Sequence, residues 1–216
     1  MEGYNLYQVY VAGGFFMHPI FACLLAGLGI SFERFRTLRR ASINTQEFLA
    51  GVKRALVEDG LRPALDLCEK TAGPVAAVFH AGLQRAPRGI EHVEKAMMNS
   101  SAVETAFLEK NLIWLSLFVS LAPMLGIAGT VQGVIKAIGQ ANAASPTLVA
   151  HGVAAALFTT LFGVLVAIIF KTAHNFFSHL IDKLVLDMET SSAGLIETLV
   201  ELEYQAQFPL NQIGQA

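Results

Sequence analysis

The sequence predicts an all-α membrane protein with three transmembrane helices, and three observations support this prediction. Of the 216 residues, 54% are hydrophobic and only 15% are charged, whereas a soluble domain carries roughly 25% charged residues. No stretch alternates apolar and polar residues over the length of a strand. Three apolar stretches approach the length of about 20 residues that a membrane-spanning helix needs, and they are residues 14–32, 111–136 and 148–171.

The distribution of basic residues predicts how the chain crosses the membrane. Residues 33–110 hold twelve of the fifteen Lys and Arg residues, and basic segments next to a span tend to remain in the cytoplasm. Residues 1–13 and the connection 137–147 then lie outside, and residues 172–216 form a cytoplasmic C-terminal helix. We therefore expect a multi-pass membrane protein with its N-terminus outside and its C-terminus in the cytoplasm. Four arginines directly follow the first span: Arg34, Arg36, Arg39 and Arg40.

The cytoplasmic region is predicted to be helical throughout. From Ile90 the helical pattern runs without Gly or Pro through Ser120, which predicts one long helix that enters the second span. The pattern of residues 176–204 likewise extends the third span, and such amphipathic extensions usually pack on one another or on neighbouring subunits. Three shorter helices, separated by Gly or Pro, precede the long one: residues 45–58, 63–69 and 75–84.

The second and third spans contain no carboxylate. No Asp or Glu occurs between Glu109 and Asp182, although an ion path through a membrane usually relies on one. If the chain conducts ions, a partner must supply the acid, and hydroxyl and backbone groups of this chain would supply the rest of the path.

Small and hydroxyl-bearing residues are concentrated in these two spans. A proline inside a helix removes a backbone donor and should kink the helix, which frees nearby carbonyl groups. Small residues on one face let two helices approach closely in lipid, so we predict a narrow seam with hydroxyls at mid-depth. In the alternative interpretation these residues only pack the helices, and each threonine bonds to its own preceding turn. The residues concerned are Pro123, Gly126, Gly129, Thr130, Gly133, Ala156, Thr159, Thr160 and Gly163.

Several other function classes find no support in the sequence. There is no metal-ligand spacing, no nucleophile–base set and no glycine-rich phosphate loop, so we expect neither an enzyme nor a metal site nor an organic cofactor. The arginine cluster fits topology and anionic lipid, and no nucleic-acid binding is expected. A substrate transporter is disfavoured because the chain shows neither an inverted repeat nor a pair of unwound helices.

Two segments of the second and third spans resemble the signature of the MotA/TolQ/ExbB proton channel family. These are residues 122–133 (APMLGIAGTVQG) and 156–163 (ALFTTLFG). The resemblance covers nearly the whole chain, and the size and three-span layout look like the ExbB/TolQ branch. Further matching positions are Glu33 and Arg34 with Leu38, residues 108–112, Pro74 and residues 81–83.

This resemblance implies the channel-forming subunit of an ion-driven motor. In the family, five copies surround the single membrane helices of two partner chains of the ExbD/TolR/MotB type, and an aspartate of the partner binds H+ or Na+. It implies a homopentamer in the lipid bilayer, in a 5:2 complex that performs work in the cell envelope, such as TonB- or Tol-type transport or gliding. The ion pathway would comprise Pro123, Thr130, Thr159 and Thr160. Packing around the partner would involve Gly126, Gly129, Gly133, Ala156 and Gly163.

One departure from the family pattern leaves the coupling ion open. ExbB and TolQ typically carry a glutamate five residues before the threonine that matches Thr160, and Ala155 occupies that position here. Thr159 directly precedes Thr160, and this Thr-Thr pair looks more like the sequence of sodium-driven stators. A Na+ site near Thr159 and Thr160 and coupling to protons therefore both remain open. The absent glutamate also keeps a non-conducting membrane scaffold as the alternative function.

Overall fold

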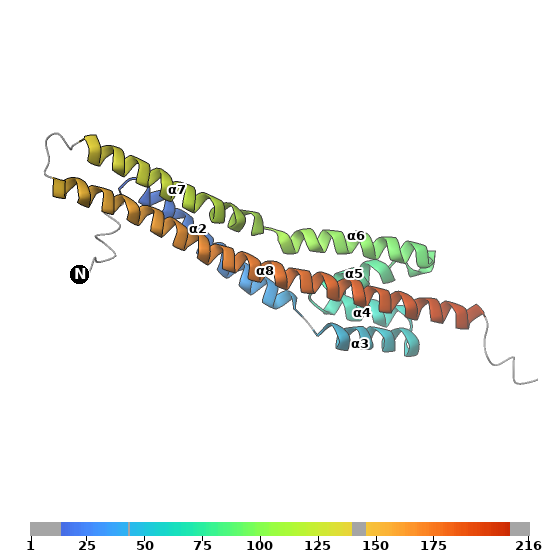
Figure 1. The fold of residues 1–216 in the computed structure, drawn as a ribbon. Helices are drawn as coiled ribbons and strands as arrows, with labels where there is room; N and C mark the ends of the chain where they lie inside the picture. The colour runs from blue at the N-terminus through green and yellow to red at the C-terminus, as the bar shows by residue number, and fades with distance from the viewer. Residues whose placement is uncertain (1–13, 43, 140–145, 208–216) are drawn as a thin grey trace, which may run out of the picture. The chain divides into compact units, whose positions relative to one another are not determined.

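The structure is a computed structural model of the 216-residue chain, and it describes residues 14–42, 44–139 and 146–207. Within these ranges there are helices, turns and loops but no strand, so the predicted all-α class is confirmed. The elements, labelled in Figure 1, are α2 (Met17–Ala41), α3 (Thr45–Glu58), α4 (Leu61–Lys70), α5 (Pro74–Leu83), the 3-10 turn η1 (Ala86–Arg88), α6 (Ile90–Glu109), α7 (Leu112–Gly139) and α8 (Pro146–Gln207).

The chain forms two compact units, of which the first contains most of α2, all of α7 and the beginning of α8. It comprises the described residues up to Phe35 together with Asn111–Phe177. A Cβ built on Gly129 of α7 would lie 3.1 Å from the Cβ of Phe16 and 3.2 Å from the Cβ of Thr159 in α8. The segment that leads into α2 therefore meets both other helices at this level.

A second level of contact in the first unit is built around Phe170. Its ring fills the space beside Gly27 of α2, where an added Cβ would lie 2.3 Å from the ring atom Cζ. The same ring lies 6.1 Å, centroid to centroid, from Phe118 of α7, and Phe170 is fully buried. From the contact at Gly129 to the contact at Phe170, residue numbers rise along α2 and α8 and fall along α7. Helices α2 and α8 therefore run in the same direction, and α7 runs antiparallel to them.

The outward faces of the first unit are apolar. On α7 the exposed large residues include Ile113, Met124 and Ile135, which are 75%, 66% and 65% accessible. So large an apolar surface marks a membrane or protein interaction face. Two helical stretches, 90–139 and 152–204, are long and apolar enough to cross a membrane by length and composition.

The predicted first span forms a helix but does not meet the same criterion. The apolar run of α2 extends from Ile20 to Phe32, with His18-Pro19 before it and Glu33-Arg34 after it, so it is shorter than the roughly 20 residues of a full span. The third membrane crossing and the pentamer therefore stay predictions.

The predicted uninterrupted helix from Ile90 into the second span is wrong. Helix α6 ends at Glu109 and α7 begins at Leu112, and between them Asn111 has a positive φ of 67°. Asparagine is among the few residues other than glycine that tolerate this left-handed conformation. Its Nδ2 donates to Glu33 Oε2 at 3.0 Å, and Arg34 Nη2 donates to Glu33 Oε1 at 2.9 Å. The Glu33 carboxylate thus accepts a hydrogen bond from Asn111 at the break and forms a salt bridge with the buried Arg34.

Several predicted boundaries differ from the observed helices. Helix α2 continues past residue 32 to Ala41, so the region 33–110 begins inside it. Helix occupies both ends of the predicted connection 137–147, because α7 runs to Gly139 and α8 begins at Pro146. Residues 1–13, 140–145 and 208–216 lie outside the described residues. The third apolar stretch and the C-terminal segment form one helix, α8, of 62 residues.

The second unit is a helical domain formed by residues 36–110 and the described residues from Ser178 onwards. The predicted helix 45–58 is found as α3, and the Asn44 side chain caps it by accepting from the backbone N–H of Glu47 at 3.4 Å. Phe48 of α3 stacks on Phe79 of α5 with 5.5 Å between ring centroids. The predicted helices 63–69 and 75–84 are found as α4 and α5.

Candidate functional site

The candidate site lies where α7 and α8 meet within the first unit. A Cβ built on Gly126 would lie 2.9 Å from the carbonyl oxygen of Thr159, and one built on Gly163 would lie 2.5 Å from the carbonyl oxygen of Ala122. Both contacts are with backbone atoms, which cannot move aside as a flexible side chain can. These glycines therefore let the two backbones approach to a distance that no larger residue permits.

The close approach continues along the same two helices. A Cβ on Gly133 would lie 2.5 Å from the Cβ of Ala156, and one on Gly152 would lie 3.0 Å from the Cβ of Ala137. The small-residue faces identified in the sequence thus lie against each other inside one chain. Their role around a partner helix stays a prediction.

Two threonine hydroxyls meet across this seam. Oγ1 of Thr130 on α7 and Oγ1 of Thr160 on α8 are hydrogen-bonded to each other. The hydroxyl of Thr130 also lies 3.1 Å from the carbonyl oxygen of Gly126 and 3.0 Å from that of Ala156. The hydroxyl of Thr160 lies 3.1 Å from the Gly126 carbonyl oxygen. Thr130 therefore contacts both its own preceding turn and α8, whereas Thr160 bonds across the seam.

The hydrogen-bond inventory of this pair allows two arrangements. Each hydroxyl donates one proton and can accept two. In one arrangement Thr160 donates to Thr130, which donates to the carbonyl oxygen of Ala156 or to that of Gly126. In the other, Thr130 donates to Thr160, which donates to the carbonyl oxygen of Gly126. Rotation of the two hydroxyl groups interconverts them, and in both arrangements the two protons are donated within the cluster while lone pairs remain free. The seam presents a donor only when one hydroxyl gives up one of these bonds and turns its proton outward, which moves no heavy atom.

Thr159 lies in the same cluster, but its hydroxyl is enclosed. It is 0% exposed, and its Oγ1 donates to the carbonyl oxygen of Ala156. That oxygen also accepts from Thr130. Thr130 and Thr160 are half-buried. The hydroxyl of Thr159 is thus enclosed next to the Ala156 carbonyl oxygen, whereas the other two hydroxyls belong to residues that are partly exposed.

Pro123 lies inside α7, which continues without interruption past it to Gly139. A proline at this position leaves the carbonyl of Val119, four residues earlier, without its helical donor. The carbonyl oxygens that the threonines contact belong instead to Gly126 and Ala156. Pro123 is therefore not placed at the threonine cluster by these contacts, and its role on an ion path stays a prediction.

Two components of the site carried no signal in the sequence. The carbonyl oxygens of Gly126 and Ala156 are backbone atoms, which any residue has. Phe16 closes the cluster at Gly129, and this contact joins residues that are far apart in the chain. Among the residues that the structure describes, no three His, Cys, Asp or Glu side chains lie together as a metal site. The absence of a metal or cofactor remains an expectation.

The residues of this seam lie within the part of the chain that matches a known protein family. The family model described as the MotA/TolQ/ExbB proton channel family matches residues 70–190, which is more than half of the chain. The biopolymer transport protein ExbB homolog of Methanothermobacter thermautotrophicus is 30% identical over 179 residues, or 81% of this chain and 63% of that protein. The biopolymer transport protein ExbB-like 1 of Synechocystis is 29% identical over 171 residues, or 76% of this chain and 67% of that protein.

A third relative matches a shorter part of the chain. Biopolymer transport protein ExbB of Xanthomonas campestris is 33% identical over 108 residues, which are 49% of this chain and 43% of that protein. The chain thus spans about two thirds or less of the length of these relatives. The family match includes α6, α7 and the seam residues of α8. The chain belongs to the MotA/TolQ/ExbB proton channel family, in its ExbB-like branch.

Proposed function

We propose that this chain is the channel-forming subunit of an inner-membrane motor that couples the flow of H+ or Na+ to mechanical work in the cell envelope. Its partner would be a single-span protein of the ExbD/TolR type with an aspartate in its membrane helix. The observation that carries the proposal is the Thr130–Thr160 hydroxyl pair, which lies against two backbone carbonyls in spans without any carboxylate. The site supplies polar oxygens but lacks a titratable group.

The chemistry of the seam fits a shared site. A proton carrier needs a group that changes its charge, and a carboxylate in a membrane is functional by default. Hydroxyls that can turn from donor to acceptor suit both forms of such a carboxylate, because the protonated acid donates and the anion accepts. A partner aspartate next to Thr160 would therefore find a bonding partner in both states. Thr159 would hold the Ala156 carbonyl in place from behind.

The same oxygens would also suit a hard cation, which prefers several oxygen ligands. Hydroxyls of Thr130 and Thr160 together with a carbonyl could complete the coordination of Na+ bound to the partner carboxylate. Ala155, which is half-buried and one residue before Ala156, adds no titratable group. The proposal therefore covers both ions, and the experiment below separates them.

The subunit stoichiometry of the complex is the first quantity to measure. This chain would be co-expressed with a single-span, aspartate-bearing protein of the ExbD/TolR type from the same organism, and the purified complex weighed by native mass spectrometry. We expect five copies with two partners, in an inner-membrane orientation with the N-terminus periplasmic and the C-terminus cytoplasmic. A homo-oligomer that never takes up the partner would favour the scaffold function, because it removes the source of the ion-binding carboxylate.

Ion flow is then measured in proteoliposomes that contain the complex. Thr160→Val keeps the shape of the side chain but removes the hydroxyl, and we expect it to abolish flow of the coupling ion while the complex still assembles. Thr172→Val is the matched control, because its hydroxyl bonds only to the carbonyl of Ile168, at 2.9 Å. A proton gradient in sodium-free buffer and a sodium gradient at constant pH identify the ion. Unchanged flow in Thr160→Val would contradict the proposed path.

A further inference from the structure

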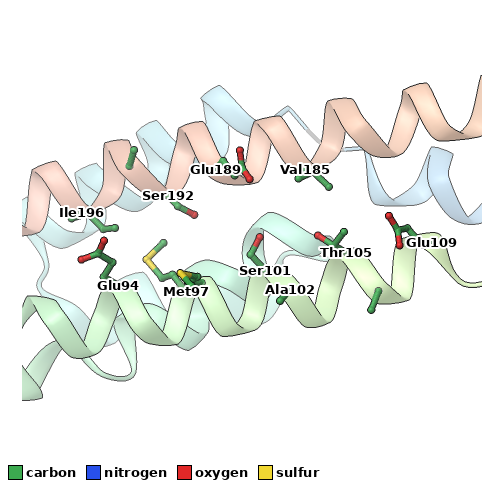
Figure 2. Close-up of a pocket in the computed structure, with 13 residues that line it drawn as sticks. Glu94, Met97, Ser101, Ala102, Thr105, Glu109, Val185, Glu189, Ser192 and Ile196 are labelled. Carbon is green, nitrogen blue, oxygen red and sulfur yellow. The ribbon is translucent and has the colours of Figure 1, made fainter.

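A groove in the second unit is unrelated to the threonine seam. It lies between α6 and the later part of α8 and has a volume of about 730 Å³. Figure 2 shows Glu94 and Ile196 at one end, Glu189 opposite Ser101 in the middle, and Glu109 at the other end. Between Glu94 and Glu109, α6 rises about 22 Å. This length corresponds to about four turns of a helix.

The uncharged lining of the groove combines adaptable apolar side chains with the hydroxyl-bearing residues Ser101, Thr105 and Ser192. Met97 is buried, whereas the neighbouring Met98 is 73% exposed. Val185 and Ile196 of α8 also line the groove, Val185 opposite Thr105 and Ile196 near Glu94 (Figure 2). Methionine side chains are flexible and polarizable, and they are frequent at surfaces that receive helices of varied sequence.

The charges that line the groove all have the same sign. Its ionisable residues are Glu94, Glu109 and Glu189, with no Lys, Arg or His among them. All three are exposed, and none makes an ion pair within the described residues. Because Glu189 lies at the level of Ser101, the three carboxylates follow one another at intervals of about two helical turns. An apolar groove with this pattern is complementary to a helix with one apolar face and basic residues at the same interval.

The chain itself offers no such helix. The segments outside the described residues, 1–13, 43, 140–145 and 208–216, contain no Lys or Arg. The arginines of α2 are clustered, and α8 carries only Lys171 and Lys183. None of the described helices has three basic residues spaced by two turns. Charge complementarity therefore favours another protein over a second copy as the occupant.

We infer that the groove between α6 and α8 binds a basic amphipathic helix of a partner protein, with its apolar face on Met98 and Val185 and its cations on Glu94, Glu189 and Glu109. This inference does not depend on ion conduction. Helix-in-groove binding of this kind takes its affinity from apolar anchors and its salt dependence from the charges at the rim.

The test uses the full chain in nanodiscs of phosphatidylcholine, which carry no net charge. The probe is a synthetic peptide of about 18 residues with leucines on one face and lysines at seven-residue intervals, and binding is measured by fluorescence anisotropy. A peptide of the same composition in scrambled order and empty nanodiscs serve as controls. We expect saturable binding that is stronger for the patterned than for the scrambled peptide and that weakens as the salt concentration rises.

Two triple variants locate the binding site. Glu94→Lys with Glu109→Lys and Glu189→Lys should weaken binding by about tenfold or more, because repulsion replaces attraction at each position. The control carries Glu58→Lys, Glu197→Lys and Glu201→Lys, which are exposed acids outside the groove, and it should change affinity by less than about twofold. Both variants have the same net charge, and their thermal unfolding confirms that they are folded.

Three results would overturn the inference. The first is an absence of peptide binding, and the second is equal weakening by the two triple variants. The third is a disulfide between copies of a Met98→Cys variant that forms quantitatively in the absence of peptide, since a second copy would then occupy the groove. None of these results bears on ion flow through the seam, so the two proposals fail independently.

Discussion

The Oγ1 of Thr160 on α8 lies 3.1 Å from the carbonyl oxygen of Gly126 on α7. This bond joins the two apolar helices at a point where the hydrogen-bonded residues, Gly126, Thr130, Ala156 and Thr160, are all threonine or smaller. Since Thr160 also contacts the hydroxyl of Thr130, a polar contact in an apolar setting depends on both threonines. Hydrogen bonds of this kind within membrane proteins contribute on average about 0.6 kcal/mol.

The coupling between the two threonines can be measured by a double-mutant cycle. Thr130→Val and Thr160→Val should each lower the free energy of unfolding by about 0.5–1.5 kcal/mol. Because each removes the same shared contact, the double variant should cost less than the sum by about 0.5 kcal/mol or more. Unfolding in mixed detergent provides the measurement. Strictly additive costs would show that the hydroxyls do not interact.

Close packing of α7 on α8 predicts that a methyl group at Gly163 is destabilising. The added Cβ of Gly163→Ala would lie 2.5 Å from the carbonyl oxygen of Ala122, so the helices must separate. We expect a loss of about 1–3 kcal/mol, seen as a lower melting temperature in detergent. Gly29→Ala is the control, because nothing lies within 4 Å of its added Cβ. Equal effects of the two variants would be inconsistent with the described contact.

The hypothesis that Thr159 makes transport depend on sodium can be tested by removing its hydroxyl. Its hydroxyl donates to the carbonyl of Ala156, which also accepts from Thr130. Thr159→Ala removes one of the two threonine donors of that carbonyl oxygen, and we expect any sodium dependence of transport to be lost while the partner still binds. The measurement is transport by the complex with and without sodium. If the unaltered complex transports equally well without sodium, the sodium hypothesis is wrong.

The left-handed backbone at Asn111 predicts an unusual order of substitutions. Its φ of 67° costs a side chain with a branched Cβ about 1–2 kcal/mol. Asn111→Val should therefore destabilise the protein more than Asn111→Gly, although both lose the bond to Glu33. Thermal unfolding of the two variants side by side gives the comparison. A glycine variant that is no more stable than the valine variant would contradict the left-handed backbone at this position.

Cys68 should resist alkylation in the folded protein. It is buried in α4, and burial raises the pKa of its thiol from 9.0 to about 11. Only the thiolate reacts, so at pH 8 the folded protein should react about a hundredfold more slowly than a free thiol. The experiment uses a Cys23→Ala background and iodoacetamide, with guanidinium-unfolded protein as the control. Labelling at the free-thiol rate before unfolding would contradict this burial.

The raised pKa of the Cys68 thiol also makes the free energy of unfolding depend on pH. Because the folded pKa lies above the unfolded value, the contribution of Cys68 is fully present below pH 9 and declines as the pH rises toward 11. Unfolding measured across this range with Cys68→Ala as the reference should therefore show the two proteins converging in stability as the pH rises.

Much of the short-range organisation could be predicted from local sequence. Helix 45–58 begins after Asn44 because a capping side chain and helical apolar spacing occur together in the sequence. The small faces of α7 and α8 were likewise recognisable, since residues on one helix face follow a fixed period. The break at Asn111 was missed because asparagine is also tolerated inside helices, and only its bond to Glu33, 78 residues away, distinguishes this position.

By itself the sequence determined that the long apolar segments contain no acid and that their threonines accompany faces of Gly and Ala. These properties depend only on residue type and helical period. The tertiary structure decided that the hydroxyls of Thr130 and Thr160 meet at the carbonyl of Gly126, and that Thr130 and the enclosed Thr159 meet at the carbonyl of Ala156. Which backbone oxygen a hydroxyl meets depends on the register and rotation of two packed helices, and those follow from contacts between distant residues.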